Sequence, residues 1–252
     1  MIYSFRRGKP ENGWVLIVHG LGEHIGRYEK MIKDLEDLGF GVIGFDLPGH
    51  GRSDGIRGDT DIEEVISIID DLTKDLGEFH IFGHSLGGLI AVRYVEERGG
   101  KIKSLVVSSP ALYVEVSPFL RKFVEIFSKL TPHRTISNGL DTSQLSRNRN
   151  AVEKYIKDPL VHDKISFRLG NSMAKNIEIA HQKAKEIKVP VLILIGTADK
   201  ITPPKGSIEF FEKLTSQDKA LVKFEGGYHE LFEDEEHSER FYNTIYEWLK
   251  RH

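Results

Sequence analysis

Short apolar runs alternate with amphipathic segments along most of the chain. The runs are rich in β-branched and aromatic residues and have the length of strands buried on both faces, at residues 14–18, 40–45, 79–82, 102–107, 189–195 and 220–224. The segments between them carry apolar residues at helical spacing, at residues 27–38, 61–76, 86–97, 207–214 and 236–251. This alternation predicts an α/β fold with a mostly parallel central sheet, flanked by helices and joined by right-handed crossovers.

The alternation stops after residue 110 and resumes near residue 181. We therefore predict a core made of residues 1–110 and 181–252, with residues 111–180 inserted as a helical cap. A predicted helix in the insertion has one apolar face, formed by Phe119, Leu120, Phe123, Val124, Phe127 and Leu130. This face either packs on the core or covers a pocket, and one helix can do both. Phe119 and Phe123 are predicted to contact substrate, and the polar stretch 138–150 predicts a surface linker or mobile segment.

Composition narrows the range of functions. With 252 residues, 39% hydrophobic content and a formal net charge of −3, the chain can bury a core of domain size. Its basic residues are scattered, which argues against a nucleic-acid partner. It has no cysteine, which excludes disulfides and thiol nucleophiles. No apolar run has the length of a signal peptide or a membrane span, so we expect a cytoplasmic protein.

A glycine-rich turn follows the apolar run at residues 79–82 and presents a serine. The turn reads Gly83-His84-Ser85-Leu86-Gly87, which contains the pattern G-x-S-x-G. In this pattern the serine lies at the apex of a sharp bend between a strand and a helix, with its hydroxyl exposed. Glycine at both ends of the pattern lets the strand and the helix approach closely. Ser85 is therefore a candidate nucleophile.

Two further polar residues follow late strands in the order that a serine nucleophile requires. Asp199 comes after the run at residues 189–195, and His229 comes after the last predicted strand. A serine hydroxyl needs a histidine to remove its proton and a carboxylate to orient that histidine. Because parallel strands present their carboxyl ends at one edge of a sheet, Ser85, Asp199 and His229 are predicted to meet there as a catalytic triad. Asp46 is the alternative acid, although its loop resembles a structural turn.

The oxyanion formed during acyl transfer needs two backbone N–H donors. We expect them at Leu86, directly after the serine, and at Leu21, in the loop after residues 14–18. Two neighbouring histidines are interpreted as structural. His19 is expected to fix the loop through a side-chain hydrogen bond, and His84 to pack beneath the serine.

Other polar clusters have simpler interpretations. His24, His50 and Asp46 lack the close spacing of metal ligands, so no metal site is predicted. The acidic run at residues 233–236 lies near a predicted helix start, where negative charge is favourable, and is interpreted as a solvated helix cap.

Several motifs can be compared with known families. They read HGLGEHIGRY at residues 19–28, DLPGHGRS at residues 46–53 and GHSLGG at residues 83–88, together with the segments at Asp199 and His229. A DPLV element at residues 158–161 lies in the predicted cap. Together these motifs resemble the monoacylglycerol lipase and lysophospholipase branch of the α/β-hydrolases. The extension G-E-H-x-x-R-Y in the first motif is the most specific, because many α/β-hydrolases share the others.

The resemblance implies an α/β-hydrolase fold and hydrolysis of medium- to long-chain monoacylglycerols to glycerol and fatty acid, through an acyl-enzyme on Ser85 and without a cofactor. It also implies that Glu23 and Arg27 organise the glycerol end of the pocket. An ion pair that braces the loop is the alternative role for these two residues. Phe232 departs from the pattern, because animal members carry a histidine at this place.

Other functions stay open at this point. A broad-specificity carboxylesterase or a lysophospholipase would use the same triad, since the scaffold does not select the substrate. A ligand-binding module without catalysis is a remote alternative, against which the complete Ser-Asp-His set argues. The apolar face of the cap predicts transient contact with lipid surfaces, and the sequence leaves the oligomeric state open.

Overall fold

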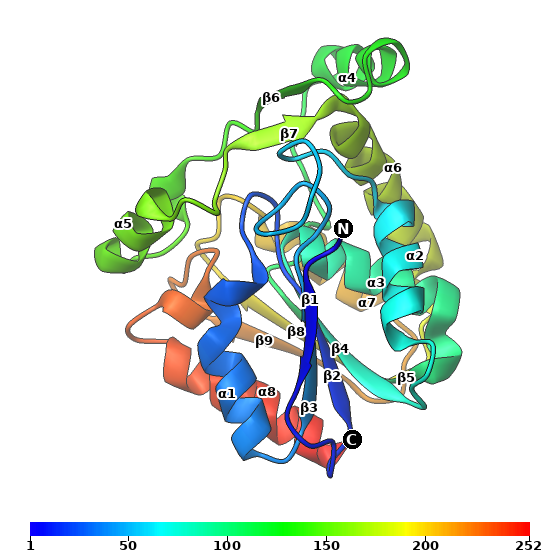
Figure 1. The fold of residues 1–252 in the computed structure, drawn as a ribbon, viewed down its shortest axis with the longest axis vertical. Coiled ribbons are helices and arrows are strands. Elements are labelled where there is room, and N and C mark those ends of the chain that lie inside the picture. The colour runs from blue at the N-terminus through cyan, green and yellow to red at the C-terminus, as the bar shows by residue number, and fades with distance from the viewer.

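A computed structural model describes residues 1–252 and contains a seven-stranded sheet in the order β1-β3-β2-β4-β5-β8-β9 (Figure 1). Its strands are β1 Ser4–Arg7, β2 Trp14–Val18, β3 Gly41–Phe45, β4 Phe79–His84, β5 Ile102–Ser108, β8 Val191–Gly196 and β9 Lys219–Phe224. All neighbours pair in parallel except β1, which runs antiparallel to β3. The predicted α/β class with a mostly parallel sheet is confirmed.

Helices cover both faces of the sheet (Figure 1). One buried cluster joins one face of the sheet to α1 Glu29–Asp37 and α8 Ser238–Arg251. A second cluster joins the other face to α2 Ile62–Thr73, α3 Leu86–Arg98, α6 Phe167–Lys183 and α7 Pro204–Lys213. None of these helices combines the length and the apolarity that crossing a membrane would require.

The sequence pattern does not predict the first strand. Residues 4–7 alternate between exposed and half-buried positions and include two arginines, so they form no apolar run. The strand forms because it pairs with the buried β3 at the edge of the sheet. Arg7 adds ion pairs with Glu29 at 2.9 Å and Glu36 at 2.6 Å on α1. Charged side chains on such an edge also discourage pairing with another chain.

The segment between β5 and β8 rises beyond the end of the sheet (Figure 1). It contains α4 Pro118–Leu130, β6 Thr135–Ser137, α5 Arg149–Lys157, β7 Lys164–Ser166 and α6, which packs back on the core. The strands β6 and β7 form a separate antiparallel pair. Ser117 and Ser166 cap α4 and α6 by accepting the amides of Leu120 and Leu169.

The polar stretch at residues 138–150 is mostly exposed or half-buried, as the sequence predicts for a surface segment, but it is also bonded to the core. It holds a short 3₁₀ helix, Thr142–Gln144, and is attached to the segment that follows His229. The amide of Glu230 donates to the carbonyl of Leu145 at 2.7 Å. Arg147 donates two hydrogen bonds, of 2.7 and 2.8 Å, to the Asp234 carboxylate. These partners lie far away in the sequence, so a local pattern of polar residues cannot reveal them.

Asp234 also corrects the interpretation of the acidic run. Its side chain is almost fully buried and accepts the amides of Glu236 and His237 as well as Arg147. The closing helix α8 begins only at residue 238. Part of the run is therefore a buried anchor for residues 138–150 rather than a solvated helix cap.

Candidate active site

Ser85 stands at a strained bend between β4 and α3. Its backbone has φ 54° and ψ −119°, a conformation that residues other than glycine rarely adopt outside such functional turns. A Cβ on Gly83 would lie 2.2 Å from the carbonyl oxygen of Gly87, and a Cβ on Gly87 would lie 2.1 Å from that of Val18. The two glycines are therefore required by the backbone itself. The bend leaves the Ser85 side chain in the wall of a cavity.

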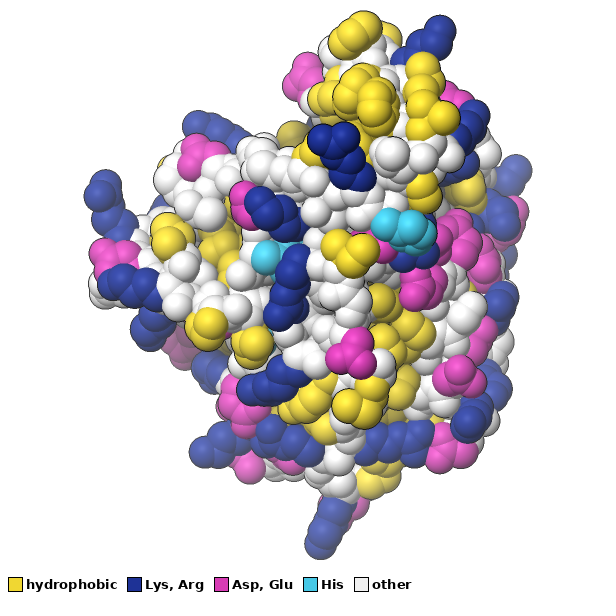
Figure 2. All heavy atoms as spheres, turned by 45° about the horizontal axis from the view of Figure 1, so that its top comes forward, with side chains coloured by type: hydrophobic (Ala, Val, Ile, Leu, Met, Phe, Trp, Pro, Cys, Tyr) yellow, Lys and Arg dark blue, Asp and Glu magenta, His cyan; other side chains and the backbone are white.

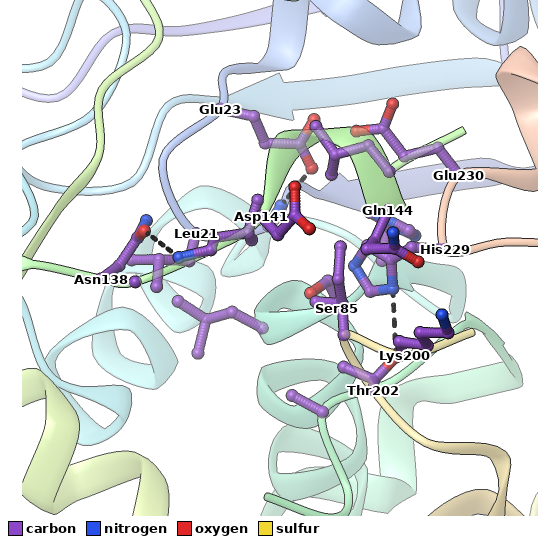
Figure 3. Close-up of a pocket in the computed structure, with 18 of the residues that line it drawn as sticks. Leu21, Glu23, Ser85, Asn138, Asp141, Gln144, Lys200, Thr202, His229 and Glu230 are labelled. Carbon is purple, nitrogen blue, oxygen red and sulfur yellow. Dashed lines mark hydrogen bonds between the residues drawn. The ribbon is translucent and has the colours of Figure 1, made fainter. Parts of the chain in front are cut away.

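His229 and Asp199 form a buried hydrogen-bonded pair on neighbouring loops. Nδ1 of His229 lies 2.8 Å from Oδ2 of Asp199. The other carboxylate oxygen, Oδ1, accepts the amides of Ile201 at 2.8 Å and Thr202 at 3.0 Å. Figure 3 shows His229 beside Ser85 in the cavity, with the hydrogen bond from His229 to Thr202 drawn. The carboxylate is thus held by backbone donors while it faces the imidazole.

The charges of this pair support each other. Burial lowers the pKa of His229, but the nearby Asp199 carboxylate raises it more, and the net shift is upward. Burial raises the pKa of Asp199, whereas His229 and the hydrogen bonds from Thr202 lower it, and the net shift is downward. The pair therefore favours an ionised carboxylate that stabilises an imidazolium. This is the charge state needed when a histidine accepts the proton of a serine.

The loop after β2 presents Leu21 toward the same cavity. The amide of Gly20 donates to Oε1 of Glu23 at 2.6 Å and is therefore occupied. The amide of Leu21 makes no hydrogen bond within the protein. Leu86 is the first residue of α3, so no earlier helical turn offers a carbonyl to its N–H. Both leucines line the cavity together with Ser85.

The structural interpretations of His19 and Asp46 are confirmed. Nδ1 of His19 lies 2.8 Å from the carbonyl of Gly20, and its Nε2 accepts the amide of Leu47 at 2.9 Å. Both ring nitrogens thus hold loops. Asp46 is fully buried and accepts the amides of Ile25 at 2.7 Å and Arg52 at 2.8 Å. Its carboxylate organises a turn and is not bonded to His229.

The remaining histidines also have protein partners. His84 directly precedes Ser85 at the bend between β4 and α3, which we call the elbow. Its ring packs against His229 at 4.7 Å and Phe232 at 5.2 Å between centroids. Burial lowers the pKa of His84 to about 3, so its ring is neutral. His24 binds Asp158 of the DPLV element at 2.9 Å, which joins the core to residues 111–180.

Glu23 and Arg27 belong to a buried ion network that sequence patterns reveal only in part. Arg27 donates to Oε2 of Glu23 at 2.8 Å and to both carboxylate oxygens of Glu230 at 2.7 and 2.8 Å. Burial raises the pKa of Glu23, but the Arg27 charge contributes most to lowering it to about 2. The guanidinium also lies over the rings of Tyr155 and Phe232, at 4.7 and 5.6 Å. These contacts match the ion pair that braces the loop, and they connect the loop after β2 to Glu230, the residue after His229.

The cavity beside Ser85 has a volume of about 570 Å³ and two chemically different ends. Besides Ser85, Thr202 and His229, its polar side chains include Glu23, Asn138, Asp141, Gln144, Lys200 and Glu230. Its apolar wall includes Ala111, Val114, Ile165 and Met173. In Figure 3, Gln144 and Glu230 lie on the His229 side of Ser85, and Asn138 lies on the opposite side.

A second cavity, of about 700 Å³, continues from the apolar end between α4 and α6. Both cavities include Val114, Asn138, Ile165 and Met173 in their walls. Tyr113 and Val116 line the second cavity as well. A long apolar group bonded to Ser85 could therefore contact apolar side chains along both cavities.

The structure does not bring Phe119 or Phe123 to either cavity. The residues of α4 that line the second cavity include Leu120 and Val124. Phe119 is 82% exposed, and Phe123 stacks on Phe127 with 4.3 Å between ring centroids. Because neighbouring residues of a helix differ by about 100° in direction, Phe119 faces outward where Leu120 faces inward.

Four residues of the site escape prediction from the sequence: Ser109, Gln144, Thr202 and Glu230. Thr202 could have been found, because an aspartate that accepts the amide three residues later is a recognisable local motif. Glu230 follows His229 directly, but its partner Arg27 lies far away in the sequence. Gln144 lies in the wall only because residues 138–150 fold back on the core.

Comparison with known proteins places this site in a family. The family described as Serine aminopeptidase, S33, matches residues 9–236. The monoacylglycerol lipase structure of Paleococcus ferrophilus has 51% sequence identity and a TM-score of 0.98, over 100% of this chain and 99% of that chain. The chain belongs to the monoacylglycerol lipase branch of the α/β-hydrolases. As a member of this branch, the protein is a carboxylic ester hydrolase.

Curated relatives of this branch carry two activities in their names. The human monoglyceride lipase is 31% identical over 87% of this chain and 76% of its own length. Phospholipase YtpA of Bacillus subtilis is 32% identical over 90% of this chain and 91% of its own length. The chain spans only 26% of the length of another relative, an abhydrolase domain-containing protein of Dictyostelium discoideum. The resemblance inferred from the motifs is confirmed at the level of the branch.

Proposed function

We propose that this protein hydrolyses medium- to long-chain monoacylglycerols to glycerol and a fatty acid, through an acyl-enzyme on Ser85. The observation that carries the proposal is the two-ended cavity around Ser85. Apolar wall residues shared with the second cavity lead toward α4 and α6, and the polar side chains of Gln144 and Glu230 lie on the His229 side. A monoacylglycerol has the same division into an apolar chain and a small polar alcohol. Residues 111–180 act in this proposal as the cap that encloses the substrate.

The proposed reaction follows from the positions of the side chains. Oγ of Ser85 attacks the ester carbonyl carbon, and His229 takes the serine proton while Asp199 stabilises the imidazolium. The amides of Leu21 and Leu86 stabilise the oxyanion. The tetrahedral intermediate then expels the glycerol oxygen, which His229 protonates. Water, activated by His229, attacks the acyl-enzyme, and the fatty acid leaves with Ser85 restored.

The polar end favours an uncharged alcohol over a phosphate. The departing alcohol must lie beside His229, because this residue protonates it. Carboxylates outnumber cations in the cavity wall: Glu23, Asp141 and Glu230 line it together with Lys200, and Arg27 is bonded to Glu23 and Glu230. An anionic head group would meet net negative charge, whereas the hydroxyls of glycerol can donate to these oxygens. Lysophospholipase activity is therefore the second choice, and Lys200 is the residue that would serve it.

Hydrolysis rates for glycerol esters and methyl esters of the same fatty acids test the head-group assignment. Gln144 is the variant to compare, because its Oε1 is buried and has no hydrogen-bond partner in the protein. We expect wild type to prefer the glycerol ester, and Gln144→Leu to lower kcat/KM for that ester about fivefold, the value of one hydrogen bond. The methyl ester rate should not change. Equal kcat/KM values for the two ester series in wild type would instead indicate a carboxylesterase.

The outer face of α4 supports a further part of the proposal, contact with the lipid surface that presents the substrate. Figure 2 shows hydrophobic side chains gathered on the projecting end of the molecule, over the cap. Phe119 and Leu130 are 82% and 70% exposed, next to the helix face that lines the second cavity. An apolar face beside the second cavity would let an acyl chain pass from a lipid aggregate into that cavity with little exposure to water.

Replacing Phe119 and Leu130 together by serine tests this contact. We expect about tenfold slower hydrolysis of a long-chain monoacylglycerol in phosphatidylcholine vesicles, because apolar area buried in lipid is lost. The kcat/KM for a water-soluble short-chain ester should stay at the wild-type value. Ile56→Ser removes an apolar residue of 52% exposure from the loop between β3 and α2, outside α4, and should change neither rate. Parallel losses on both substrates would contradict the contact.

A further inference from the structure

Ser109, the residue that follows β5, has an unusual backbone for its type. Its φ is 43°, in the left-handed region that favours glycine, and its side chain is almost fully buried. Ser85 is the only other residue besides the glycines with a positive φ. Such conformations persist in residues with a Cβ where the surroundings impose them, and they cluster at functional sites.

The polar groups of Ser109 reach the loops that carry the acid and the base. Its hydroxyl donates to the backbone carbonyl of His229 at 2.8 Å. Its carbonyl accepts the hydroxyl of Thr202 at 2.9 Å, next to Asp199. Its amide donates to the carbonyl of Leu194, near the end of β8, at 2.8 Å.

The residues on either side of Ser109 hold the nucleophile in the same way. The amide of Ser85 donates to the carbonyl of Ser108 at 3.0 Å. The amide of Ala111 donates to the carbonyl of Ser85 at 2.9 Å. One short segment, residues 108–111, is therefore bonded to the backbone of Ser85 and His229 and, through Thr202, to the loop of Asp199.

We propose that Ser109 is a positioning residue, whose hydroxyl and left-handed backbone hold the main chain of His229 in register with Ser85 and the Asp199 loop. The inference rests on the triad proposed above. Asp199 fixes the imidazole at Nδ1 alone, and a ring held at one atom can still swing at Nε2, where the serine proton is taken. The hydrogen bond from the Ser109 hydroxyl to the main-chain carbonyl of His229 restricts this movement. A shift of about 1 Å in a reacting group is sufficient to lower a rate about 10²-fold.

The choice of serine over glycine supports a role for the hydroxyl. Glycine would adopt the backbone of Ser109 without strain, as it does at ten other positive-φ positions of this chain. Glycine offers no side-chain donor for the His229 carbonyl. Serine has an unfavourable positive φ at this position, but its hydroxyl supplies the donor.

Two variants separate the positioning role from a general effect on folding. Ser109→Ala loses the hydroxyl and keeps the strain, whereas Ser109→Gly loses the hydroxyl and relieves the strain. We expect kcat on a soluble chromogenic ester to fall about tenfold or more in both, with KM within about twofold of wild type. Ser109→Gly should have a higher Tm than Ser109→Ala and yet show no recovery of kcat. If Ser109→Ala does not fold, Ser109→Gly still decides the question.

The pH profile adds a readout that a purely structural residue would not move. In wild type, Asp199 raises the pKa of His229 against the effect of burial. A His229 main chain without the hydrogen bond from Ser109 should weaken that contact and lower this pKa. The acid limb of kcat/KM should therefore shift to lower pH in both Ser109 variants.

Ser104→Ala is the matched control. Ser104 is a fully buried serine of β5, the strand that Ser109 follows, and its hydroxyl is bonded to His80 rather than to the triad. We expect it to lower Tm but to leave kcat unchanged. Wild-type kcat in Ser109→Gly, or an equal loss of kcat in Ser104→Ala, would overturn the inference. Failure of wild type to react with a fluorophosphonate at Ser85 would instead reject the triad itself, and the inference with it.

Discussion

Ser85→Ala should lower kcat on a monoacylglycerol by a factor of about 10⁵, because no other group at the elbow can form the acyl-enzyme. The fold should survive the change. The Ser85 hydroxyl makes no hydrogen bond that the fold depends on, and alanine has the same Cβ at this strained backbone. Steady-state hydrolysis measures the loss, and thermal unfolding should give a Tm within about 2 °C of wild type.

Covalent labelling gives the same prediction a second readout. A fluorophosphonate should modify wild type once, at Ser85, and should leave Ser85→Ala unlabelled. Ser67→Ala, an exposed serine on α2, should retain wild-type rate and labelling. More than about 1% of wild-type kcat in purified Ser85→Ala would contradict the acyl-enzyme. A wild type that hydrolyses nothing and resists the label would revive the non-catalytic alternative.

Arg27→Met should produce the largest loss of stability. Arg27 compensates two buried carboxylates, Glu23 and Glu230, whose side chains are 4% and 3% exposed. Removing the cation leaves both charges buried without a partner, and this typically destabilises a protein by about 3–5 kcal/mol. Urea unfolding at pH 7 measures the difference. Arg121→Met, which breaks a pair between α4 and α6 that is about half exposed, should lower the free energy of unfolding by no more than about 1 kcal/mol.

The loss of unfolding free energy in Arg27→Met should be smaller at acidic pH. In wild type the pKa of Glu23 is lowered to about 2, so its ionised form stabilises the fold above its unfolded value of 4.5, and this contribution is lost as pH falls from 4.5 to 2. Without Arg27, burial should raise the pKa of Glu23, and protonation of its carboxylate then relieves the variant. Arg27→Met combined with Glu23→Gln and Glu230→Gln should recover most of the loss at pH 7. A loss below about 1 kcal/mol for Arg27→Met would show that the network does not brace the fold.

The same network explains how this chain accommodates Phe232, where animal relatives are expected to have histidine. Phe232 is buried and packs on Tyr28 and His84 with 5.3 and 5.2 Å between ring centroids. It offers no hydrogen bond to a substrate. Arg27 is bound to Glu230 and covered by Phe232 and does not line the cavity, although Glu23 does. In the proposed function, head-group contacts therefore fall to the polar wall of the cavity, including Gln144.

The sequence by itself determined the parts of the protein whose physical cause is local. Continuous apolar runs require burial on both faces, which is why the six parallel strands and the order of the core helices could be predicted. The elbow could be predicted because only glycine tolerates the approach of β4 to α3 around Ser85. The proximity of Ser85, Asp199 and His229 could be predicted because each follows a parallel strand, and the carboxyl ends of these strands meet at one edge of the sheet.

Only the tertiary structure decided the contacts between distant segments. The partners of Arg27 and Arg147 lie 203 and 87 residues away, at Glu230 and Asp234, and no periodicity in the chain connects them. The outward direction of Phe119 depends on which side of α4 meets α6, a choice that an apolar stripe leaves undecided. The role of Ser109 depends on a left-handed backbone and on loops brought together by the sheet. Such contacts arise from the packing of complete elements, because side chains far apart in sequence meet only after the sheet has formed.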